Sequence, residues 1–216
     1  MCRCGDMDKQ EELIKIAEEV KKCRKCSLWQ GAIQSVPGEG SFDAEVVFVG
    51  EAPGFHEDQR GIPFCGAAGK LLDKLLALAK LRRDEVFITN VLKHRPPGNR
   101  DPLPSEIEAC RPFLDRQIGI IEPKIIATLG RFSMAKFLPN VLISQVHGQP
   151  RFVQRGEREL IVVPMYHPAA ALRNGKIMVA EQEDFMKLGK FLEKLNGGEE
   201  VEVEKEKEKE EQLKLI

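Results

Sequence analysis

The 216-residue sequence lacks the marks of several protein classes. It has no apolar run near the roughly 20 residues that a membrane-spanning helix needs. Its first residues, MCRCGD, include no apolar segment of the kind that a secretory signal carries. Aromatic residues make up only 6%, and no internal repeat is visible. We therefore expect an intracellular, cytoplasmic protein.

Neither sign of charge dominates, because the sequence contains 33 Lys and Arg residues and 34 Asp and Glu residues. Residues 196–216 nevertheless hold eight Glu and four Lys, and subtracting this −4 from the total of −1 leaves +3 for residues 1–195. A mildly basic body permits nucleic-acid binding without requiring it. We predict one domain over 1–195 and a charged tail over 196–216 that is disordered or helical.

Six cysteines in an intracellular chain do not predict a disulfide framework. Cys23 and Cys26 form a CxxC pair, a spacing used by metal and iron–sulfur sites. The pair alone does not choose its metal, so zinc stays open. The Gly-rich loop at residues 50–54 is not GxGxxG, which argues against a dinucleotide-binding fold.

Strand and helix patterns alternate along the chain. Nearly continuous apolar runs predict buried strands at 46–49, 85–90, 124–130 and 160–165. Helical periodicity is found at 8–22, 70–81, 105–121, 131–138 and 180–195. The alternation predicts an α/β fold, a three-layer α/β/α domain with a central, mostly parallel four-stranded sheet. We expect a hairpin over 148–163.

Three of the predicted strands end in residues suited to ligand binding. The loop 50–54 follows the first strand, Asn90 ends the second and His167 follows the last. Taken singly, Asn90 is more often a turn residue and a lone His a structural one. Because ligands bind beyond the carboxyl ends of parallel strands, their convergence favours a site. A carboxamide can pair with the imide edge of a pyrimidine, and Phe64 offers a stacking face.

Five segments together resemble the family 4 uracil-DNA glycosylases, the iron–sulfur branch of that superfamily. They are GEAPG at 50–54 followed by Glu57-Asp58, GIPFCGAAG at 61–69, ITN at 88–90, RPPGNR at 95–100 and HPAAALRN at 167–174. The resemblance covers roughly residues 12–195. It implies a DNA repair enzyme that flips uracil out of DNA and hydrolyses its N-glycosidic bond, leaving an abasic site. No lysine stands at an obvious place for a Schiff base, so we expect a monofunctional glycosylase.

The resemblance also implies a role for individual residues. His167, Asn90 and Glu51 are the expected catalytic residues. Uracil is expected to contact Gly50, Glu51, Ala52, Gly54, Phe64, Asn90 and His167. DNA is expected to contact Arg95, Arg100, Leu172 and Arg173. Better-known relatives carry Asp where Ala52 stands, which leaves Glu51, Glu57 and Asp58 as candidates for activating water, and we favour Glu51.

A [4Fe–4S] cluster is the cofactor that the resemblance implies. Cys23, Cys26 and Cys110 match three family ligands, and His94 stands where the family commonly has a fourth Cys. Three interpretations stay open: His94 is a ligand; Cys2, Cys4 or Cys65 substitutes; or the cluster is weakened or absent. We favour the set Cys23, Cys26, His94 and Cys110.

Uracil-containing DNA is the partner that the resemblance implies, bound by a nucleoid-associated monomer, with room for contacts with replication or repair proteins. A charged fraction of 31%, with Glu- and Lys-rich segments, suits a thermophile. Two other classes compete with the glycosylase: a non-catalytic, metal-containing nucleic-acid-binding module and a redox enzyme. Release of free uracil from DNA would separate them.

Overall fold

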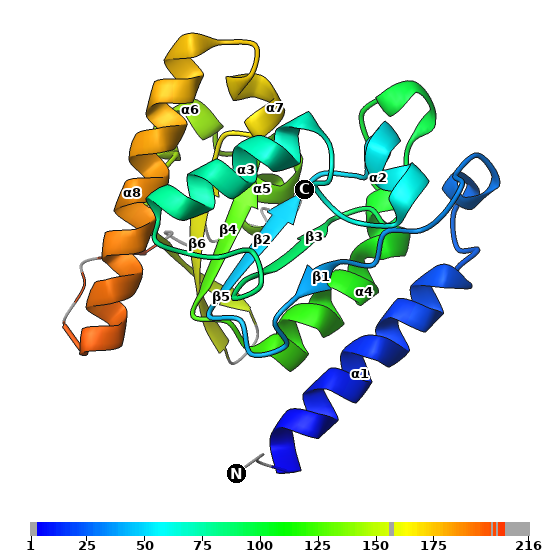
Figure 1. Ribbon diagram of the computed structural model, residues 1–216, viewed down its shortest axis with the longest axis horizontal. Coiled ribbons are helices and arrows are strands. Elements are labelled where there is room, and N and C mark those ends of the chain that lie inside the picture. Colours follow the sequence, from blue (N-terminus) through cyan, green and yellow to red (C-terminus); the bar gives the residue numbers. More distant parts are fainter. Residues whose placement is uncertain (1–3, 156–157, 200, 202, 206–216) are drawn as a thin grey trace, which may run out of the picture.

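The computed structural model describes residues 4–155, 158–199, 201 and 203–205 (Figure 1). These residues form a seven-stranded sheet in the order β1-β3-β2-β4-β6-β5-β7. The strands are β1 Glu39–Gly40, β2 Val46–Gly50, β3 Phe87–Asn90, β4 Ile125–Leu129, β5 Arg151–Arg155, β6 Arg158–Met165 and β7 Glu204–Lys205. Strands β3, β2, β4 and β6 are parallel, whereas β1 runs antiparallel to β3 and β5 runs antiparallel to β6.

The α/β class and the four central parallel strands confirm the sequence prediction, but the total of four strands was too low. The predicted hairpin is β5 and β6, whose ladder joins Arg151 to Val162 and Arg155 to Arg158. Strands β1 and β7 were missed because two residues are too few to show a period-two pattern.

Each predicted helix is present, and shorter ones were missed. The α-helices are α1 Cys4–Lys21, α2 Phe55–Arg60, α3 Ala67–Leu78, α4 Pro104–Ile121, α5 Arg131–Phe137, α6 Ile143–Val146, α7 Pro168–Ala171 and α8 Gly175–Gly197. Two 3₁₀ turns span Ser27–Gln30 and Pro97–Asn99. The missed helices α2, α6 and α7 hold at most six residues, too few for a helical repeat to show.

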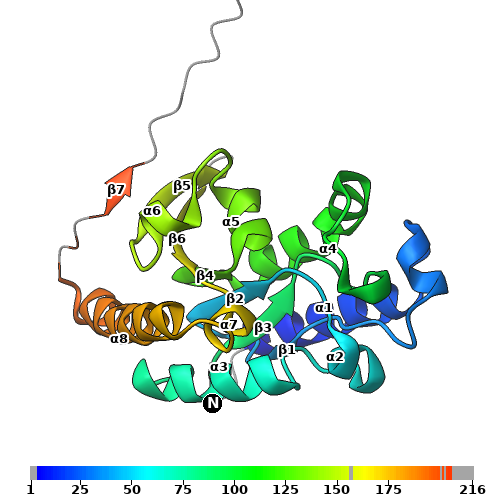
Figure 2. The same ribbon diagram turned by 90° about the horizontal axis from the view of Figure 1, so that it is seen from above.

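Helices cover both faces of the sheet. Val46 and Phe48 of β2 pack in one apolar cluster with α3 and α8. Val47 and Val49 point to the other face and pack with α4 and α5. Figure 2 shows these two layers on opposite sides of the strands. A strand buried on both faces reads as a continuous apolar run, which is why β2 was visible in the sequence.

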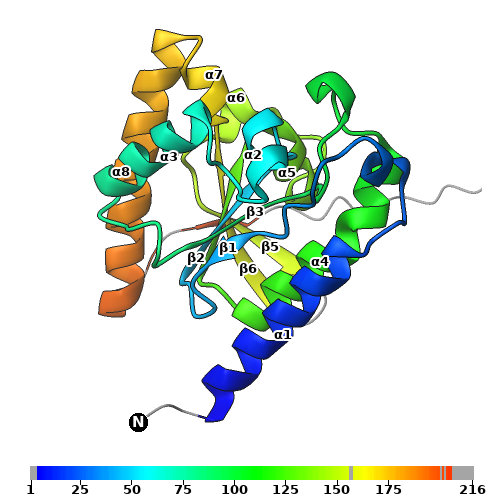
Figure 3. The same ribbon diagram turned by 45° about the vertical axis from the view of Figure 1, so that its right-hand side comes forward.

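Helix α1 forms an outer layer against α4 (Figure 3). Its buried residues Ile16 and Val20 contact Phe113 of α4, and Arg116 of α4 bonds to Glu19. This contact brings the chain that follows α1, with Cys23 and Cys26, to the start of α4. Cys26 packs in one apolar cluster with Ala52 and Leu92, which follow β2 and β3, so it lies beside the carboxyl ends of these strands.

The predicted tail over 196–216 falls mostly outside the described residues. Helix α8 continues to Gly197, and Glu204–Lys205 pairs in parallel with β5. Among the described residues, no helix combines the length and the apolar character needed to cross a membrane.

Candidate active site

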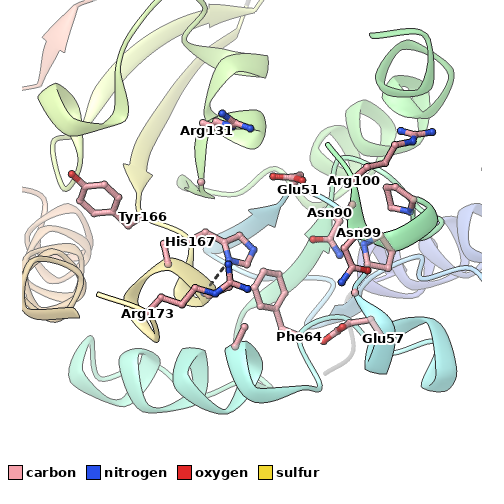
Figure 4. Close-up of a pocket in the computed structure, with 18 of the residues that line it drawn as sticks. Glu51, Glu57, Phe64, Asn90, Asn99, Arg100, Arg131, Tyr166, His167 and Arg173 are labelled. Atoms are coloured by element: carbon pink, nitrogen blue, oxygen red, sulfur yellow. Dashed lines mark hydrogen bonds between the residues drawn. The ribbon is translucent and has the colours of Figure 1, made fainter. Parts of the chain in front are cut away.

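A cavity of about 720 Å³ opens at the carboxyl ends of the four parallel strands. Its lining includes Glu51 after β2, Asn90 at the end of β3, Arg131 after β4 and His167 after β6 (Figure 4). Strand β2 pairs with β3 on one side and with β4 on the other. The chain runs from β2 to β3 and then crosses back over β2 to form β4. The cavity therefore lies at the topological switch point, where α/β sheets bind ligands.

Gly50 lets two pocket groups approach the end of β2. A Cβ atom there would lie 2.3 Å from Asn90 Oδ1 and 2.7 Å from the Phe64 ring. Asn90 is only 1% exposed, and its Oδ1 has no hydrogen-bond partner among the described residues. Leaving a buried carbonyl oxygen without a hydrogen bond costs about 1–3 kcal/mol of stability. Asn90 Oδ1 is therefore available to accept a hydrogen bond from a ligand.

Phe64 occupies a left-handed backbone conformation, with φ of 48°. Its main chain lies directly against α3: a Cβ on Gly69 would meet the Phe64 carbonyl oxygen at 1.6 Å. The ring is buried and stacks against His167, with centroids 5.6 Å apart and planes 27° apart. A strained aromatic residue in a pocket wall is typical of a functional site.

Two side chains hold the main chain on both sides of Phe64. Glu57 Oε1 accepts hydrogen bonds from the amides of Cys65 at 3.0 Å and Gly66 at 3.1 Å, at the N-terminus of α3. Arg83 donates to the Pro63 carbonyl at 2.5 Å and binds Glu39 and Asp73 as well. Arg83, whose side chain is 27% exposed, therefore holds the Pro63 side of the Phe64 loop.

His167 is the N-cap residue of α7. Its Nδ1 accepts a hydrogen bond from the Ala169 amide at 3.1 Å, which leaves the proton of the neutral ring on Nε2. Burial lowers the pKa of His167 to about 4, against a smaller opposing effect of Glu57. Nε2 has no hydrogen-bond partner among the described residues, and a neutral imidazole with an available N–H suits the stabilisation of a developing negative charge.

Glu51 lines the same cavity and is half-buried. Burial raises the pKa of Glu51, Asp101 raises it further, and Arg131 acts in the opposite direction. Arg131 pairs with Asp101 at 2.5 Å. Arg131 was not predicted from the sequence, because Gly followed by Arg at a strand end is an ordinary start for a helix.

The other two carboxylates proposed for water activation accept hydrogen bonds from backbone amides instead. Asp58 is 2% exposed, and its Oδ1 accepts a hydrogen bond from the Ile33 amide at 2.9 Å, which ties α2 to the loop after the CxxC segment. Glu57 holds the Phe64 loop. Ala52 lines the cavity and packs against an apolar cluster that contains Cys110.

A buried lysine supports Asn90 from behind. Lys93 is 0% exposed and donates to the Asn90 carbonyl at 2.9 Å, to Thr89 Oγ1 at 2.6 Å and to Gln117 Oε1 at 2.8 Å. Burial lowers the pKa of Lys93 to about 7, while its three acceptors favour the ammonium form. The network fixes the main chain that carries the pocket carboxamide.

The residues expected to contact DNA surround the cavity in different environments. Arg173 lines the cavity, and Leu172 beside it is 50% exposed. Arg100 also lines the cavity but is bound to both carboxylate oxygens of Glu106, at 2.9 and 2.6 Å. Arg95 lies over the Phe55 ring. Figure 4 shows Arg173 on the His167 side and Arg100 on the Asn99 side.

Three cysteines are neighbours at the start of α4. Cys26 packs against an apolar cluster that contains Cys110, and Cys23 is close enough to affect the pKa of each. Burial raises the pKa of Cys110 to about 11. Cys65 instead has Glu57, Arg60 and Arg83 as charged neighbours. Cys2 lies outside the described residues, and Cys4 begins α1.

His94 is 4% exposed, and burial lowers its pKa, which favours the neutral form that binds metals. Its charged neighbours are Arg24 and Asp58 rather than the thiols. The described residues contain no group of three or more His, Cys, Asp or Glu side chains arranged to hold a metal ion. Thiol and imidazole groups are donor types that suit an iron–sulfur cluster. The thiols would have to move closer together to bind one.

Comparisons with known proteins address the same part of the chain. A family model described as "Uracil DNA glycosylase superfamily" matches residues 37–195. A type-4 uracil-DNA glycosylase of Sulfurisphaera tokodaii is 52% identical over 82% of this chain and 84% of that protein. Those of Archaeoglobus fulgidus and Thermotoga maritima are 47% and 43% identical, over 83% and 86% of this chain and 93% and 97% of theirs. The matched span includes all four parallel strands.

Proposed function

The chain belongs to the type-4 branch of the uracil-DNA glycosylase superfamily, and we propose that it excises uracil from DNA in the cavity at the carboxyl ends of its parallel strands. Membership confirms the resemblance noted in the sequence. The observation that carries the proposal is the buried, unpaired Oδ1 of Asn90 beside Phe64 and His167. The enzyme is monofunctional, hydrolysing the bond without a Schiff base.

A flipped uracil is recognised by its Watson–Crick edge. Asn90 Oδ1 accepts the N3–H proton of uracil, and the amide nitrogen donates to O4. Phe64 supplies the stacking face. The pairing relieves the unmet hydrogen bond of Asn90, which helps to offset the few kcal/mol needed to unstack the base.

His167 stabilises the leaving group. As the N-glycosidic bond breaks, its electron pair moves to uracil and charge accumulates on O2. The Nε2–H of neutral His167 donates to that oxygen, and the amide of Ala169 holds the ring in the required tautomer. Such donors typically contribute a factor of about 10²–10³ to the rate.

Glu51 is the proposed base. A water molecule attacks C1′ of the deoxyribose, its proton passes to the Glu51 carboxylate, and uracil leaves as the anion. Burial and Asp101 raise the pKa of Glu51, which makes it a stronger base than an exposed glutamate. Ala52 can take no part in this proton transfer.

The proposal predicts that Asn90→Ala and His167→Ala lose excision rather than DNA binding. With a single-uracil oligonucleotide, wild type should release free uracil and leave an alkali-labile site. Each variant should do so about 10²–10³ times more slowly while its Kd for DNA changes little. His56→Gln, outside the cavity, is the control. Equal losses of binding and excision would contradict the assigned roles.

The rate should depend on pH through Glu51. Only the ionised carboxylate accepts a proton, so excision rises with pH through the raised pKa of Glu51, above the usual value of about 4.3. His167, with a pKa of about 4, stays neutral over that range. Asp101→Asn removes a negative charge and should move the acidic limb to lower pH. A limb that stays in place would argue against Glu51 as the base.

We further propose a structural [4Fe–4S] cluster held by Cys23, Cys26 and Cys110, with His94 as fourth ligand. The packing of Cys26 near Cys110, with Cys23 close enough to affect the pKa of both, and the burial that keeps the His94 imidazole neutral support this set. A bound cluster supplies a cross-link between the segment after α1, the loop after β3 and α4. Its role is to hold that side of the cavity.

Anaerobically purified protein should be brown and contain iron. Cys110→Ser and His94→Ala should lose iron and lower the Tm, His94→Cys should retain iron, and Cys65→Ser should match wild type. Zinc in place of iron, or full iron content in His94→Ala, would overturn the ligand set.

Because its substrate is uracil-containing DNA, we further propose that the protein acts inside the cell at the nucleoid. We also propose that it acts as a monomer. Phosphate contacts by Arg173 and insertion of Leu172 into the base stack are proposed on the same ground, since both flank the cavity. Contacts with replication or repair proteins stay a prediction.

A further inference from the structure

Arg95 is held in place by two neighbours. It lies in the loop after β3, with its guanidinium carbon 5.2 Å from the centroid of the Phe55 ring. Asn99 Oδ1 accepts a hydrogen bond from Arg95 Nε at 2.7 Å. The Phe55 ring supports the guanidinium group, and the hydrogen bond to Asn99 fixes the direction of its Nε–H.

The local sequence explains why Asn99 reaches Arg95. In Pro96-Pro97-Gly98-Asn99 the Asn99 amide bonds to the Pro96 carbonyl at 3.0 Å. Gly98 and Asn99 are both left-handed, with φ of 62° and 55°. The chain therefore turns back on itself, and the side chain of Asn99 returns to the arginine that precedes the turn.

This unit lies at the edge of the cavity. Pro96 and Asn99, which follow Arg95, are part of the cavity lining, and so is Gly54, which precedes Phe55. The Phe55 ring is 52% exposed although it begins α2. Arg95 and Phe55 thus stand just outside the space that the flipped base would enter.

Arg95 differs from the other arginines on this side of the cavity. Arg100 donates to both oxygens of Glu106, and Arg131 pairs with Asp101. In the described part of the chain, neither Nη atom of Arg95 has a hydrogen-bond or ion-pair partner. An oriented guanidinium fork with free Nη atoms has the geometry that binds phosphate oxygens.

Arg95 is one of the residues expected to contact DNA, and we propose that Phe55 and Asn99 orient it to form a phosphate subsite for the DNA backbone next to the flipped nucleotide. Arg95 binds the phosphodiester, while Phe55 and Asn99 act only by orienting it. The inference rests on the proposed function, which supplies the DNA. Successive phosphates of a stacked strand are spaced about 3.4 Å along the helix axis, so a phosphate flanking the flipped nucleotide lies near the mouth of the cavity.

The first test is the salt dependence of binding to duplex DNA that carries a tetrahydrofuran abasic analogue, which cannot be hydrolysed. Arg95→Gln should lower the slope of log K against log salt concentration by about 0.9, the value for one phosphate contact. Arg82→Gln removes the same charge at the opposite end of the sheet, where Arg82 is exposed and pairs with Asp84, and should leave the slope unchanged. An unchanged slope in Arg95→Gln would overturn the subsite.

The second test asks whether Phe55 acts through Arg95. Phe55→Leu removes the aromatic face and should weaken binding about two- to fivefold in the wild-type background. In the Arg95→Gln background it should have no effect, because there is no guanidinium left to orient. Additive losses would show that Phe55 contacts DNA directly and would overturn its assigned role. Uracil release by wild type separates failure of this subsite from failure of the proposed function.

Discussion

The cavity depends on the close approach at the end of β2, where Gly50 has no side chain. The Asn90 carboxamide and the Phe64 ring occupy the space that a Cβ atom would need. These groups come from β3 and from the loop before α3. Lys93 holds the Asn90 carbonyl, and Glu57 holds the amides after Phe64. A base-binding wall is thus built from main-chain geometry before any ligand arrives.

The electrostatics of the cavity follow from the same packing. His167 is neutral because it is enclosed and its Nδ1 is occupied by a backbone amide, while Glu51 is a stronger base because burial disfavours its charge. Ala52 stands where a carboxylate would be the obvious base, and it packs instead towards Cys110. Stabilisation of the departing uracil therefore carries more of the proposed catalysis than activation of water.

Local pattern was sufficient to predict the central parallel strands and the long helices, because their burial creates a period in the sequence. The order of the motifs was sufficient to predict that Asn90, Phe64 and His167 converge. The supporting contacts were not predictable, because they join distant residues: Arg83 reaches back to Pro63, and Lys93 reaches forward to Gln117. Neither arginine nor lysine carries a local mark of burial, so only the folded chain reveals these roles.

The most direct test of this account is the single-turnover rate of uracil release by Gly50→Ala from duplex DNA with one uracil. The added methyl displaces Asn90 and Phe64, and a misplacement of about 1 Å can cost about 100-fold in rate. Gly119→Ala adds the same methyl on α4, where nothing lies within 4 Å, and should keep the wild-type rate. We expect a folded, DNA-binding Gly50→Ala protein that is slower by about that factor. Release at the wild-type rate would contradict it.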